Sequence, residues 1–406
     1  MRETVFSELI APLSTFMSNV GSNIDDKSGS KVLFFEDFLK ILVFGRSINV
    51  ASMRKLLKEL TTNQAAAELG LPEVAYSTFR DGFSRFNVLY FKQLYDHVQK
   101  SCTWFDVPEL RYLGLLKAVD GSLFPTLCSM DWADYKRHAK ALKLHLAFNL
   151  NTSSTNEFLI SEGNRSERSF LISILERGVT YICDRGYFSF EVLQEMNKVH
   201  AMFVLRLKDN IKFDVGVSLK LTGVIPACFS QIKDDLVRFT NDKEQKVYRI
   251  IRFKVLNSYF ILCTNRLELT TIEVIMLYAY RWQIELIFKF LKRSLNGLHL
   301  FAQGEQTSQI NFYVLLIAAL LQLRLKQIFL TREQENTVKN QDNDINNLTN
   351  VNTRQPYTGY SPDKWMKSVN TIFEKGVKIS SDWLLYLKNF IAQDIDNQVI
   401  RIFNSA

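Results

Sequence analysis

The chain of 406 residues is 47% hydrophobic and 23% charged, a balance typical of a soluble globular protein and not of a disordered or fibrous one. The formal net charge of +8 favours a polyanionic partner, and the surplus is local, because residues 211–300 hold 14 Lys and Arg against 8 Asp and Glu. Five cysteines without a CxxC pair argue against a thiolate zinc site and indicate a reducing compartment.

No segment is predicted to enter a membrane. The longest apolar run, residues 312–323, is too short to span a bilayer, and residues 1–9 lack the basic start and apolar core of a signal peptide. We therefore expect a cytoplasmic protein without a membrane partner.

The first 105 residues are predicted to form a helical region, because apolar residues recur at a spacing of three to four from Val32 to Lys100. Within it, residues 64–86 predict two short helices around a turn at Gly70–Pro72. This pattern fits a helix-turn-helix that binds DNA, and it fits an ordinary helical hairpin equally well.

Residues 110–208 are predicted to begin a mixed α/β domain. Short apolar or alternating runs predict strands, and residues 166–178 predict an amphipathic helix between them. The first strand is expected to end at Asp120 and the fourth at Asp184. The other predicted strands cover residues 142–150, 157–161 and 202–208.

Residues 209–257 lack a helical period and are predicted to form an inserted antiparallel β subdomain. Its basic residues are candidates for DNA contact or simply a solvated strand face: Lys243, Lys246, Arg249, Arg252 and Lys254. The second part of the α/β domain is expected at 258–331, with a helix that begins at Thr270 or Thr271 and carries Glu273 in its first turn.

The end of the chain changes in composition. Residues 332–360 are rich in Asn and polar, as in a flexible linker, and residues 361–406 predict a final helical region.

The helix expected over YAYRWQIELIFKFLK, residues 278–292, combines an apolar surface with one polar stripe. At about 100° per residue, the stripe holds five side chains, namely Tyr278, Arg281, Glu285, Lys289 and Lys292. A buried carboxylate needs a cation, a hydrogen bond or a metal. An internal ion pair of Glu285 with Arg281 or Lys289 is one explanation.

Asp120 and Asp184 offer a second explanation for the carboxylate of Glu285. Each aspartate follows an apolar strand and precedes a glycine-containing turn, DGS and DRGY. Two strand aspartates and a helix glutamate form an oxygen-rich site suited to Mg²⁺, which supports phosphodiester chemistry.

These motifs resemble a known family. The order of strand aspartate, strand aspartate, inserted β region and helix glutamate resembles the RNase H-like DDE transposases. The spacing Tyr278-x2-Arg281-x3-Glu285-x6-Lys292 matches the YREK signature of the IS-four family of bacterial insertion-sequence transposases. The resemblance implies an RNase H-like mixed sheet with an N-terminal helical DNA-binding domain.

The resemblance also implies roles for the site residues. Asp120, Asp184 and Glu285 would be catalytic and bind Mg²⁺ or Mn²⁺, as two ions, and Tyr278, Arg281 and Lys292 would contact DNA. Arg185, next to the second aspartate, and Lys289, on the stripe, are further candidates for DNA contact, with a surface arginine as the plain alternative for Arg185.

The implied function is cleavage and strand transfer at the inverted-repeat ends of an insertion sequence. The implied partners are double-stranded transposon-end and target DNA and a second copy of the chain in a paired-end complex, in the nucleoid-associated cytoplasm of a bacterium. Two alternatives stay open at this point: an inactive or domesticated DNA-binding derivative, and an RNase H-like nuclease without strand transfer.

Overall fold

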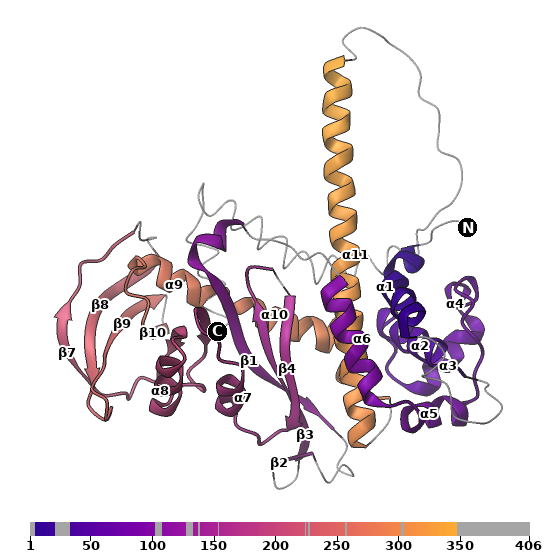
Figure 1. The fold of residues 1–406 in the computed structure, drawn as a ribbon, viewed down its shortest axis with the longest axis horizontal. Coiled ribbons are helices and arrows are strands. Elements are labelled where there is room, and N and C mark those ends of the chain that lie inside the picture. Colours follow the sequence, from indigo (N-terminus) through magenta and orange to yellow (C-terminus); the bar gives the residue numbers. More distant parts are fainter. Residues whose placement is uncertain are drawn as a thin grey trace. The chain divides into compact units, whose positions relative to one another are not determined.

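The computed structural model describes residues 5–20, 33–101, 108–126, 133–136, 139–152, 154–223, 225, 228–255, 258–301 and 304–346 (Figure 1). The chain divides into two compact units. Among the described residues, one unit holds 5–101 and 290–346, and the other holds 108–289. The predicted helical region 361–406 lies outside the described residues.

The first unit is helical, as predicted for residues 32–100. Its N-terminal helices are α1 (Val5–Val20), α2 (Phe35–Ser47), α3 (Met53–Thr62), α4 (Gln64–Glu68), α5 (Tyr76–Arg85) and α6 (Val88–Ser101). Phenylalanines of α2 and α5 form its core, with the rings of Phe38 and Phe83 5.0 Å apart and edge to face. The predicted helix pair is α4 and α5, but residues 69–75 between them form a longer connection than the turn of about 3–4 residues in a helix-turn-helix.

A long C-terminal helix belongs to this first unit. Helix α11 (Glu305–Asn346) packs against α6, α2 and α1, and Arg46 of α2 donates hydrogen bonds to the carbonyl oxygens of Asn296 and His299. Residues 290–331 therefore pack with the N-terminal helices, although the sequence predicted them within the α/β domain.

Helix α11 also continues into the predicted Asn-rich linker, as far as Asn346. The physical reason is that no Gly or Pro interrupts residues 305–346, and Gln, Glu and Lys among them favour a helix. Its stretch Glu305–Leu325 is long and apolar enough to cross a membrane, but 78% of it is buried inside the protein, as in the core helix of a globular protein.

The second unit is built on a large mixed sheet, which confirms the predicted α/β class. The strand order is β2-β3-β1-β5-β6-β10-β9-β8-β7, and β4 pairs with β3 (Figure 1). Among the described strands, the parallel pairs are β1 with β5 and β5 with β6. A 3₁₀-helix (Pro108–Leu113) leads into the strands β1 (Leu115–Pro125), β2 (Asp134–Lys136), β3 (Ala139–Asn149), β4 (Ser154–Glu162), β5 (Val179–Cys183), β6 (Met202–Arg206), β7 (Phe213–Ser218), β8 (Phe229–Phe239), β9 (Val247–Val255) and β10 (Ser258–Thr264).

The predicted insertion 209–257 is antiparallel, but it does not form a sheet of its own. Strand β9 pairs with β10 over seven residues, so that β7, β8 and β9 extend the central sheet. The connection between β9 and β10 is short, which favours antiparallel pairing of these two strands as a hairpin. The inner strands of the extended sheet then bury both of their faces. A separate subdomain is thus not what the structure shows.

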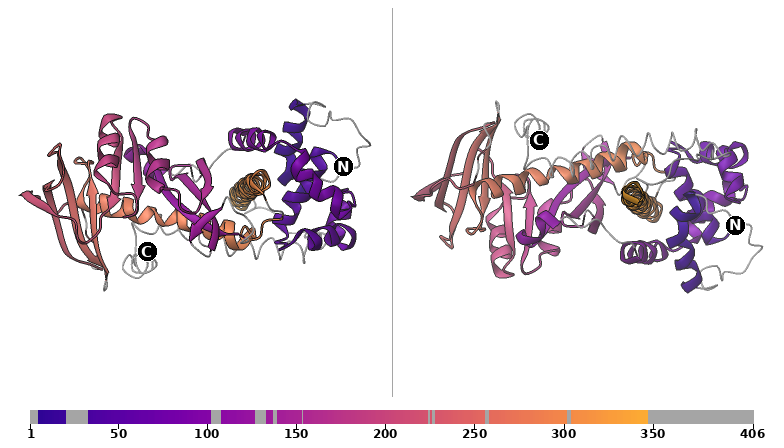
Figure 2. Two further views of the ribbon diagram at one scale, coloured as in Figure 1. Left: turned by 90° about the horizontal axis from the view of Figure 1, so that it is seen from below. Right: turned by 90° about the horizontal axis from the view of Figure 1, so that it is seen from above.

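Helices cover both faces of the central strands (Figure 2). Helices α7 (Glu167–Ser173) and α8 (Phe190–Lys198) bury Phe170, Val192 and Met196 against one face, where Tyr181 and Cys183 of β5 also point. Helices α9 (Thr271–Tyr280) and α10 (Trp282–Lys289) contact β1, β5, β6 and β10. All five residues of β5 are buried as a result. Helix α8 was not predicted from the sequence.

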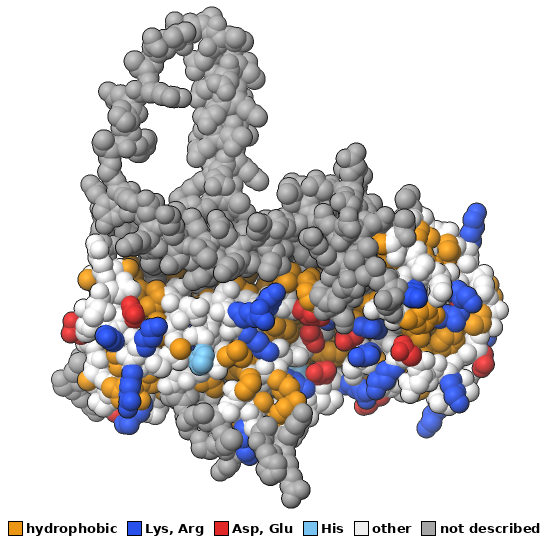
Figure 3. Space-filling model, turned by 180° about the vertical axis from the view of Figure 1, so that it is seen from behind, with side chains coloured by type: hydrophobic (Ala, Val, Ile, Leu, Met, Phe, Trp, Pro, Cys, Tyr) orange, Lys and Arg blue, Asp and Glu red, His pale blue; other side chains and the backbone are white. Residues whose placement is uncertain are grey.

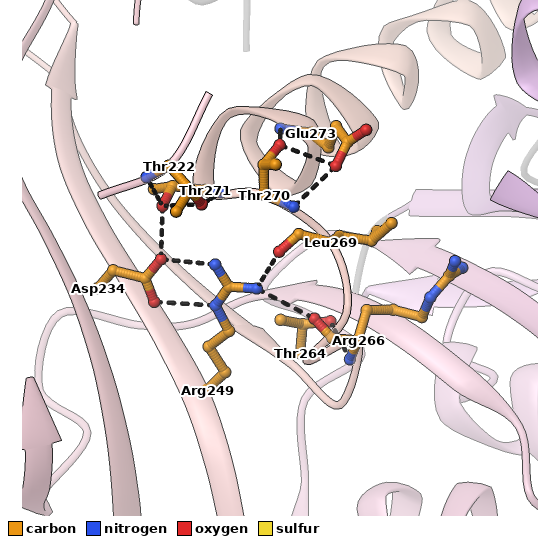
Figure 4. Close-up of polar contacts among 9 residues, drawn as sticks. All are labelled: Thr222, Asp234, Arg249, Thr264, Arg266, Leu269, Thr270, Thr271 and Glu273. Atoms are coloured by element: carbon orange, nitrogen blue, oxygen red, sulfur yellow. Dashed lines mark hydrogen bonds and ion pairs between the residues drawn. The ribbon is translucent and has the colours of Figure 1, made fainter. Parts of the chain in front are cut away.

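A buried ion pair fixes the start of α9 to the sheet (Figure 4). Arg249 of β9 donates two hydrogen bonds to Asp234 of β8, at 2.9 and 2.6 Å, and a third to the carbonyl oxygen of Leu269, just before the helix. Thr271 donates to the same carboxylate at 2.7 Å, and Thr270 forms a capping box with Glu273. The predicted cap and first-turn glutamate of this helix are confirmed.

The same ion pair corrects one set of candidates for DNA contact. Arg249 is 3% exposed and its guanidinium is used internally, so it is not free to bind a phosphate. Arg252 pairs with Asp235, and Lys246 pairs with Glu244 at 2.9 Å. Of the five basic residues proposed in this region, Lys243 and Lys246 are exposed, and both lie in the connection between β8 and β9.

Candidate active site

The two candidate aspartates lie side by side on neighbouring parallel strands. The pairing of β1 with β5 ends at Val119 and Cys183, and Asp120 and Asp184 are the next residues of each chain segment. Adjacent strands are about 4.8 Å apart, so the two carboxylates start from neighbouring backbone positions. Asp120 does not end its strand, however, because β1 continues to Pro125, paired with β3.

The predicted single helix over residues 278–292 is three segments. Helix α9 ends at Tyr280, α10 starts at Trp282, and residues 290–294 form a π-helix. At the break, the N–H of Arg281 donates to the carbonyl oxygen of Tyr278, three residues earlier instead of the four of an α-helix. This tighter turn changes the direction in which the following side chains leave the helix axis. The five stripe residues therefore do not share one surface: Tyr278 and Arg281 are buried, and Lys289 is exposed.

Arg281 lies among the carboxylates. Its guanidinium forms an ion pair with Glu285, one turn further along the chain, and lies 3.8 Å from Oδ2 of Asp120. Only 4% of the arginine side chain is exposed, against 23% of Asp120 and 28% of Glu285. The internal ion pair that the sequence suggested for Glu285 is thus present, and it also connects Glu285 to Asp120.

Asp184 has its own partners. The hydroxyl of Tyr278 donates to its Oδ1 at 3.2 Å, and the guanidinium of Arg206 lies 3.9 Å from the same oxygen. Arg206 ends β6, the strand next to β5, and covers the ring of Phe260 at 4.4 Å. Arg206 was not among the predicted site residues, although a basic residue at the end of a strand expected beside Asp184 was a usable signal.

Burial raises the pKa of two of the carboxylates, those of Asp120 and Glu285. Burial raises the pKa of Asp120 to about 7, although Arg281 and the N–H of Gly121 oppose the shift. Burial also raises the pKa of Glu285, again against the effect of Arg281. Burial raises the pKa of Tyr278 to about 12, so its hydroxyl stays a donor. Shifted acids grouped in one place are typical of functional sites.

The donor chemistry fits a divalent cation. Asp120, Asp184 and Glu285 supply carboxylate oxygens, the ligands that hard cations prefer, and nearby Arg281 limits their repulsion. Within the part of the chain that the structure describes, no three His, Cys, Asp or Glu side chains are close enough together to ligate one ion. The three acids are therefore the right type of ligand for a cation, and their side chains would have to move to bind one ion together.

The remaining candidates lie at different levels of exposure. Arg185 follows Asp184 in the turn and is exposed, as is Lys289 at the end of α10. Lys292 is half-buried in the π-helix, in the first unit. The structure thus brings Asp120, Asp184, Tyr278, Arg281 and Glu285 together. The contacts described for these five residues include neither Arg185 nor Lys289, and Lys292 belongs to the other unit.

Comparison with known proteins shows the family of the chain. Residues 114–321, more than half of the chain, match the family model described as transposase DDE domain. A mixed sheet that carries acids on adjacent strands and on a facing helix, with this match, defines an enzyme that acts on DNA. More narrowly, the chain belongs to the transposase DDE domain family and is a DDE transposase.

Three relatives point the same way. A protein of Geobacillus stearothermophilus named as a probable transposase for insertion sequence element IS5377 is 25% identical over 257 residues, 62% of this chain and 67% of the relative. A protein of Synechocystis named as a putative transposase for insertion sequence element IS4SA is 27% identical over 48% of this chain, and a protein of Sinorhizobium fredii named as a putative transposase is 24% identical over 53%. The chain spans 56% and 62% of these last two relatives.

Family membership carries two general properties. A transposase DDE domain depends on divalent metal ions and binds DNA. No observation favours the inactive or purely nucleolytic alternatives.

Proposed function

We propose that this transposase binds the inverted-repeat ends of an insertion sequence, cuts DNA there and transfers the freed strand, as a member of the IS-four family with an RNase H-like fold. The observation that carries the proposal is the placement of Asp120 and Asp184 directly after the last β1–β5 pair, with Glu285 connected to Asp120 through Arg281. The three acids of the YREK and aspartate motifs are far apart in sequence, and the fold gathers them.

Asp120, Asp184 and Glu285 are the residues proposed to hold Mg²⁺ or Mn²⁺, as two ions. When bound, such ions activate water or a 3′-hydroxyl and stabilise the leaving oxygen in phosphodiester chemistry. The chain itself supplies positioned carboxylates: the N–H of Gly121 orients Asp120 at 2.8 Å, and Tyr278 orients Asp184.

Arg281 is proposed to contact DNA phosphate in addition to the acids. Its Nε is buried and has no hydrogen-bond partner among the described residues, so the guanidinium retains one unused donor. Tyr278 and Lys292 of the YREK pattern, and exposed Arg185 and Lys289, are the other proposed DNA contacts. Arginine and lysine pair with phosphate through charge and hydrogen bonds.

A cleavage assay on cognate ends tests this function. Asp184→Asn is expected to abolish strand cleavage in Mg²⁺, whereas the matched control Asp209→Asn, at an exposed position beyond β6, is expected to cut like the wild type. Cutting by Asp184→Asn would overturn the assignment of the acids. Cutting without strand transfer by the wild type would favour a nuclease.

The N-terminal helical region, residues 1–105, is proposed to help bind the ends. Helix α3 exposes Arg54, Lys55 and Lys58 to solvent. The face drawn in Figure 3 shows Lys and Arg side chains mixed with Asp and Glu, without one continuous basic surface. We therefore expect specific short basic patches to carry DNA contact, and α3 is the candidate in this region.

A matched pair of variants tests the α3 contact. Arg54→Gln with Lys58→Gln is expected to weaken DNA binding and to reduce the slope of log affinity against log salt by about 2, roughly one for each phosphate that the variant no longer neutralises. The control double variant, Lys92→Gln with Lys100→Gln, removes two exposed charges from α6 and is expected to bind like the wild type. Equal slopes for both would remove α3 from the interface.

The resemblance further supports a homodimer in a paired-end complex, in the nucleoid-associated cytoplasm of a bacterium. Sedimentation of the protein with and without end DNA tests the dimer. A single protomer on two joined ends would overturn it.

A further inference from the structure

A fourth acidic side chain, Glu167, lies against the backbone of both aspartate motifs. A Cβ atom added to Gly121, in DGS, would lie 3.1 Å from its Oε1, and one added to Gly186, in DRGY, would lie 3.1 Å from its Oε2. Both distances are shorter than ordinary carbon–oxygen contact. The two glycines therefore leave the space that this carboxylate occupies.

The position of Glu167 is the gap where β1 and β5 separate. Strand pairing ends at Val119 and Cys183, and Gly121 and Gly186 lie two and three residues further along their segments. Side chains alternate between the faces of a strand, so that Asp120 starts on the face opposite to Gly121. Gly121 directly follows Asp120, so the carboxylate of Glu167 lies beside the backbone of this aspartate, and after burial its charge also helps to raise the pKa of Asp120.

Helix α7 and the side chain of Lys143 hold Glu167 in this position. It is the first residue of α7, where the helix N-terminus favours a negative charge. Nζ of Lys143, on the neighbouring strand β3, lies 3.2 Å from Oε1, and this lysine is itself mostly buried, with 14% of its side chain exposed. Glu167 is 27% exposed, close to the value for Asp120.

An unused buried hydroxyl adds an independent observation. Tyr187, from the DRGY turn, is 1% exposed, and its hydroxyl has no hydrogen-bond partner among the described residues. Tyr187 belongs to the same buried cluster as Val119 and Cys183, the residues that precede the two aspartates. Burial raises the pKa of Tyr187, and among charged groups Asp120 and then Glu167 raise it further. A buried hydroxyl without a partner is rare, and a ligand or its bound water would satisfy it.

We propose that Glu167 is a further metal-binding residue of the active site and that it holds, together with Asp120, one of the divalent cations on which the enzyme depends. A pair of carboxylates completed by water and substrate oxygens is sufficient for Mg²⁺. Lys143 balances the charge of Glu167, and the hydroxyl of Tyr187 would supply a hydrogen-bond donor beside the ion. The inference rests on the proposed role of Asp120 as a metal ligand.

Binding of Mn²⁺ to the full chain without DNA, followed by electron paramagnetic resonance, tests the proposal apart from activity. Glu167→Gln keeps the shape of the side chain and removes its charge, and it is expected to weaken Mn²⁺ binding at least about tenfold. Glu191→Gln makes the same change in the first turn of α8, at an exposed position, and is expected to bind Mn²⁺ like the wild type.

A second variant tests the geometry and leaves every charge in place. Gly186→Ala is expected to displace the carboxylate of Glu167 and to weaken Mn²⁺ binding in the same direction. The control Gly216→Ala adds a Cβ at an ordinary 3.5 Å from the carbonyl oxygen of Leu236 and is expected to have no effect. Tyr187→Phe is expected to weaken binding less than Glu167→Gln does.

The variant Asp120→Asn distinguishes failure of this inference from failure of the proposed metal site. If Asp120→Asn weakens Mn²⁺ binding while Glu167→Gln and Gly186→Ala bind like the wild type, Glu167 is not a ligand and the inference is overturned. If Asp120→Asn also binds like the wild type, the proposed metal site itself is wrong. Should Glu167→Gln fail to fold, Gly186→Ala decides, since only the end of a flexible side chain has to move in that variant.

Discussion

Arg281 and Glu285 form an ion pair across one turn of the chain, and the same guanidinium lies 3.8 Å from Asp120. Two acids contributed by a strand and a helix are thus connected by a single buried cation. Burial alone would lower the pKa of Arg281, but Tyr278, Glu285 and Asp120 raise it, so the arginine stays charged. The arginine of the YREK pattern therefore has a structural task in addition to the proposed contact with DNA.

Replacing Arg281 is expected to affect stability and activity together. Arg281→Ala leaves Asp120 and Glu285 without their cation, and we expect a loss of about 1–3 kcal/mol in the free energy of unfolding, because both acids are partly solvated. DNA cleavage should fall at least a hundredfold. Arg281→Lys should retain most of the stability, since it keeps the charge, but should cleave slowly.

Thermal unfolding and cleavage rates check the prediction for Arg281. Arg238→Ala, at an exposed position on β8, is the matched control and should leave both quantities unchanged. Wild-type cleavage by Arg281→Ala would show that the ion pair has no role at the site.

Asp120 is expected to destabilise the metal-free protein at alkaline pH. Its pKa is raised to about 7 in the folded state from an ordinary value of 3.8, so the folded chain keeps this proton over a pH range in which the unfolded chain releases it. Stability from the protonated acid is present at low pH and lost as the pH rises through about 7. Asp120→Asn, neutral at every pH, should be more stable than the wild type at pH 8 by about 1–3 kcal/mol.

Unfolding in the presence of a chelator, from pH 4 to pH 8, checks the prediction for Asp120. The advantage of Asp120→Asn should shrink towards zero near pH 4. Ser122→Ala, two positions along β1, removes no ionisable group, and its difference from the wild type should stay constant with pH. A constant difference for Asp120→Asn as well would contradict the raised pKa.

The hydroxyl of Tyr278 is expected to position Asp184. Tyr278→Phe removes the hydrogen bond of 3.2 Å to Oδ1 and should cost about 0.5–1.5 kcal/mol in the free energy of unfolding. Cleavage should slow about tenfold or more, because Asp184 then keeps only the more distant Arg206 as a partner among the contacts described for it.

Single-turnover cleavage rates check the role of Tyr278. Tyr259→Phe, at an exposed position on β10, is the control and should cut at the wild-type rate. If Tyr278→Phe loses stability but not rate, the hydroxyl is structural only.

The Asp234–Arg249 pair should matter more to stability than any surface ion pair of this chain. Both side chains are almost fully buried, and Asp234→Asn leaves an arginine charge without its partner, which should cost about 3–5 kcal/mol. Lys246→Ala, which breaks an exposed pair with Glu244, should cost at most about 1 kcal/mol.

Denaturant unfolding distinguishes these two variants, and a double variant identifies the cause. Asp234→Asn combined with Arg249→Met should lose less than the sum of the single changes, because each single change leaves one buried charge unpaired, whereas the double variant leaves none. Simple additivity would mean that the two residues act separately and that the start of α9 is held by other contacts.

Local sequence signals determined much of the fold. Alternation and apolar runs located most strands, because a half-buried or buried strand must show such patterns. Thr270 and Glu273 marked the start of α9, because a capping box satisfies backbone donors within four residues of sequence. The two aspartate motifs and the YREK spacing were likewise readable from the sequence, and they indicated the family.

The tertiary structure decided what depends on partners distant in sequence. Only the pairing of β9 with β10 shows that the predicted insertion extends the central sheet, and only the register of β1 with β5 places Asp120 beside Asp184 while β1 continues past it. The tightened bond at Arg281 ends a helix that periodicity alone would continue, and it buries the arginine among acids. Glu167 had no motif of its own, because its significance comes from two glycines that are 46 and 19 residues away from it in sequence and at contact distance from it in space.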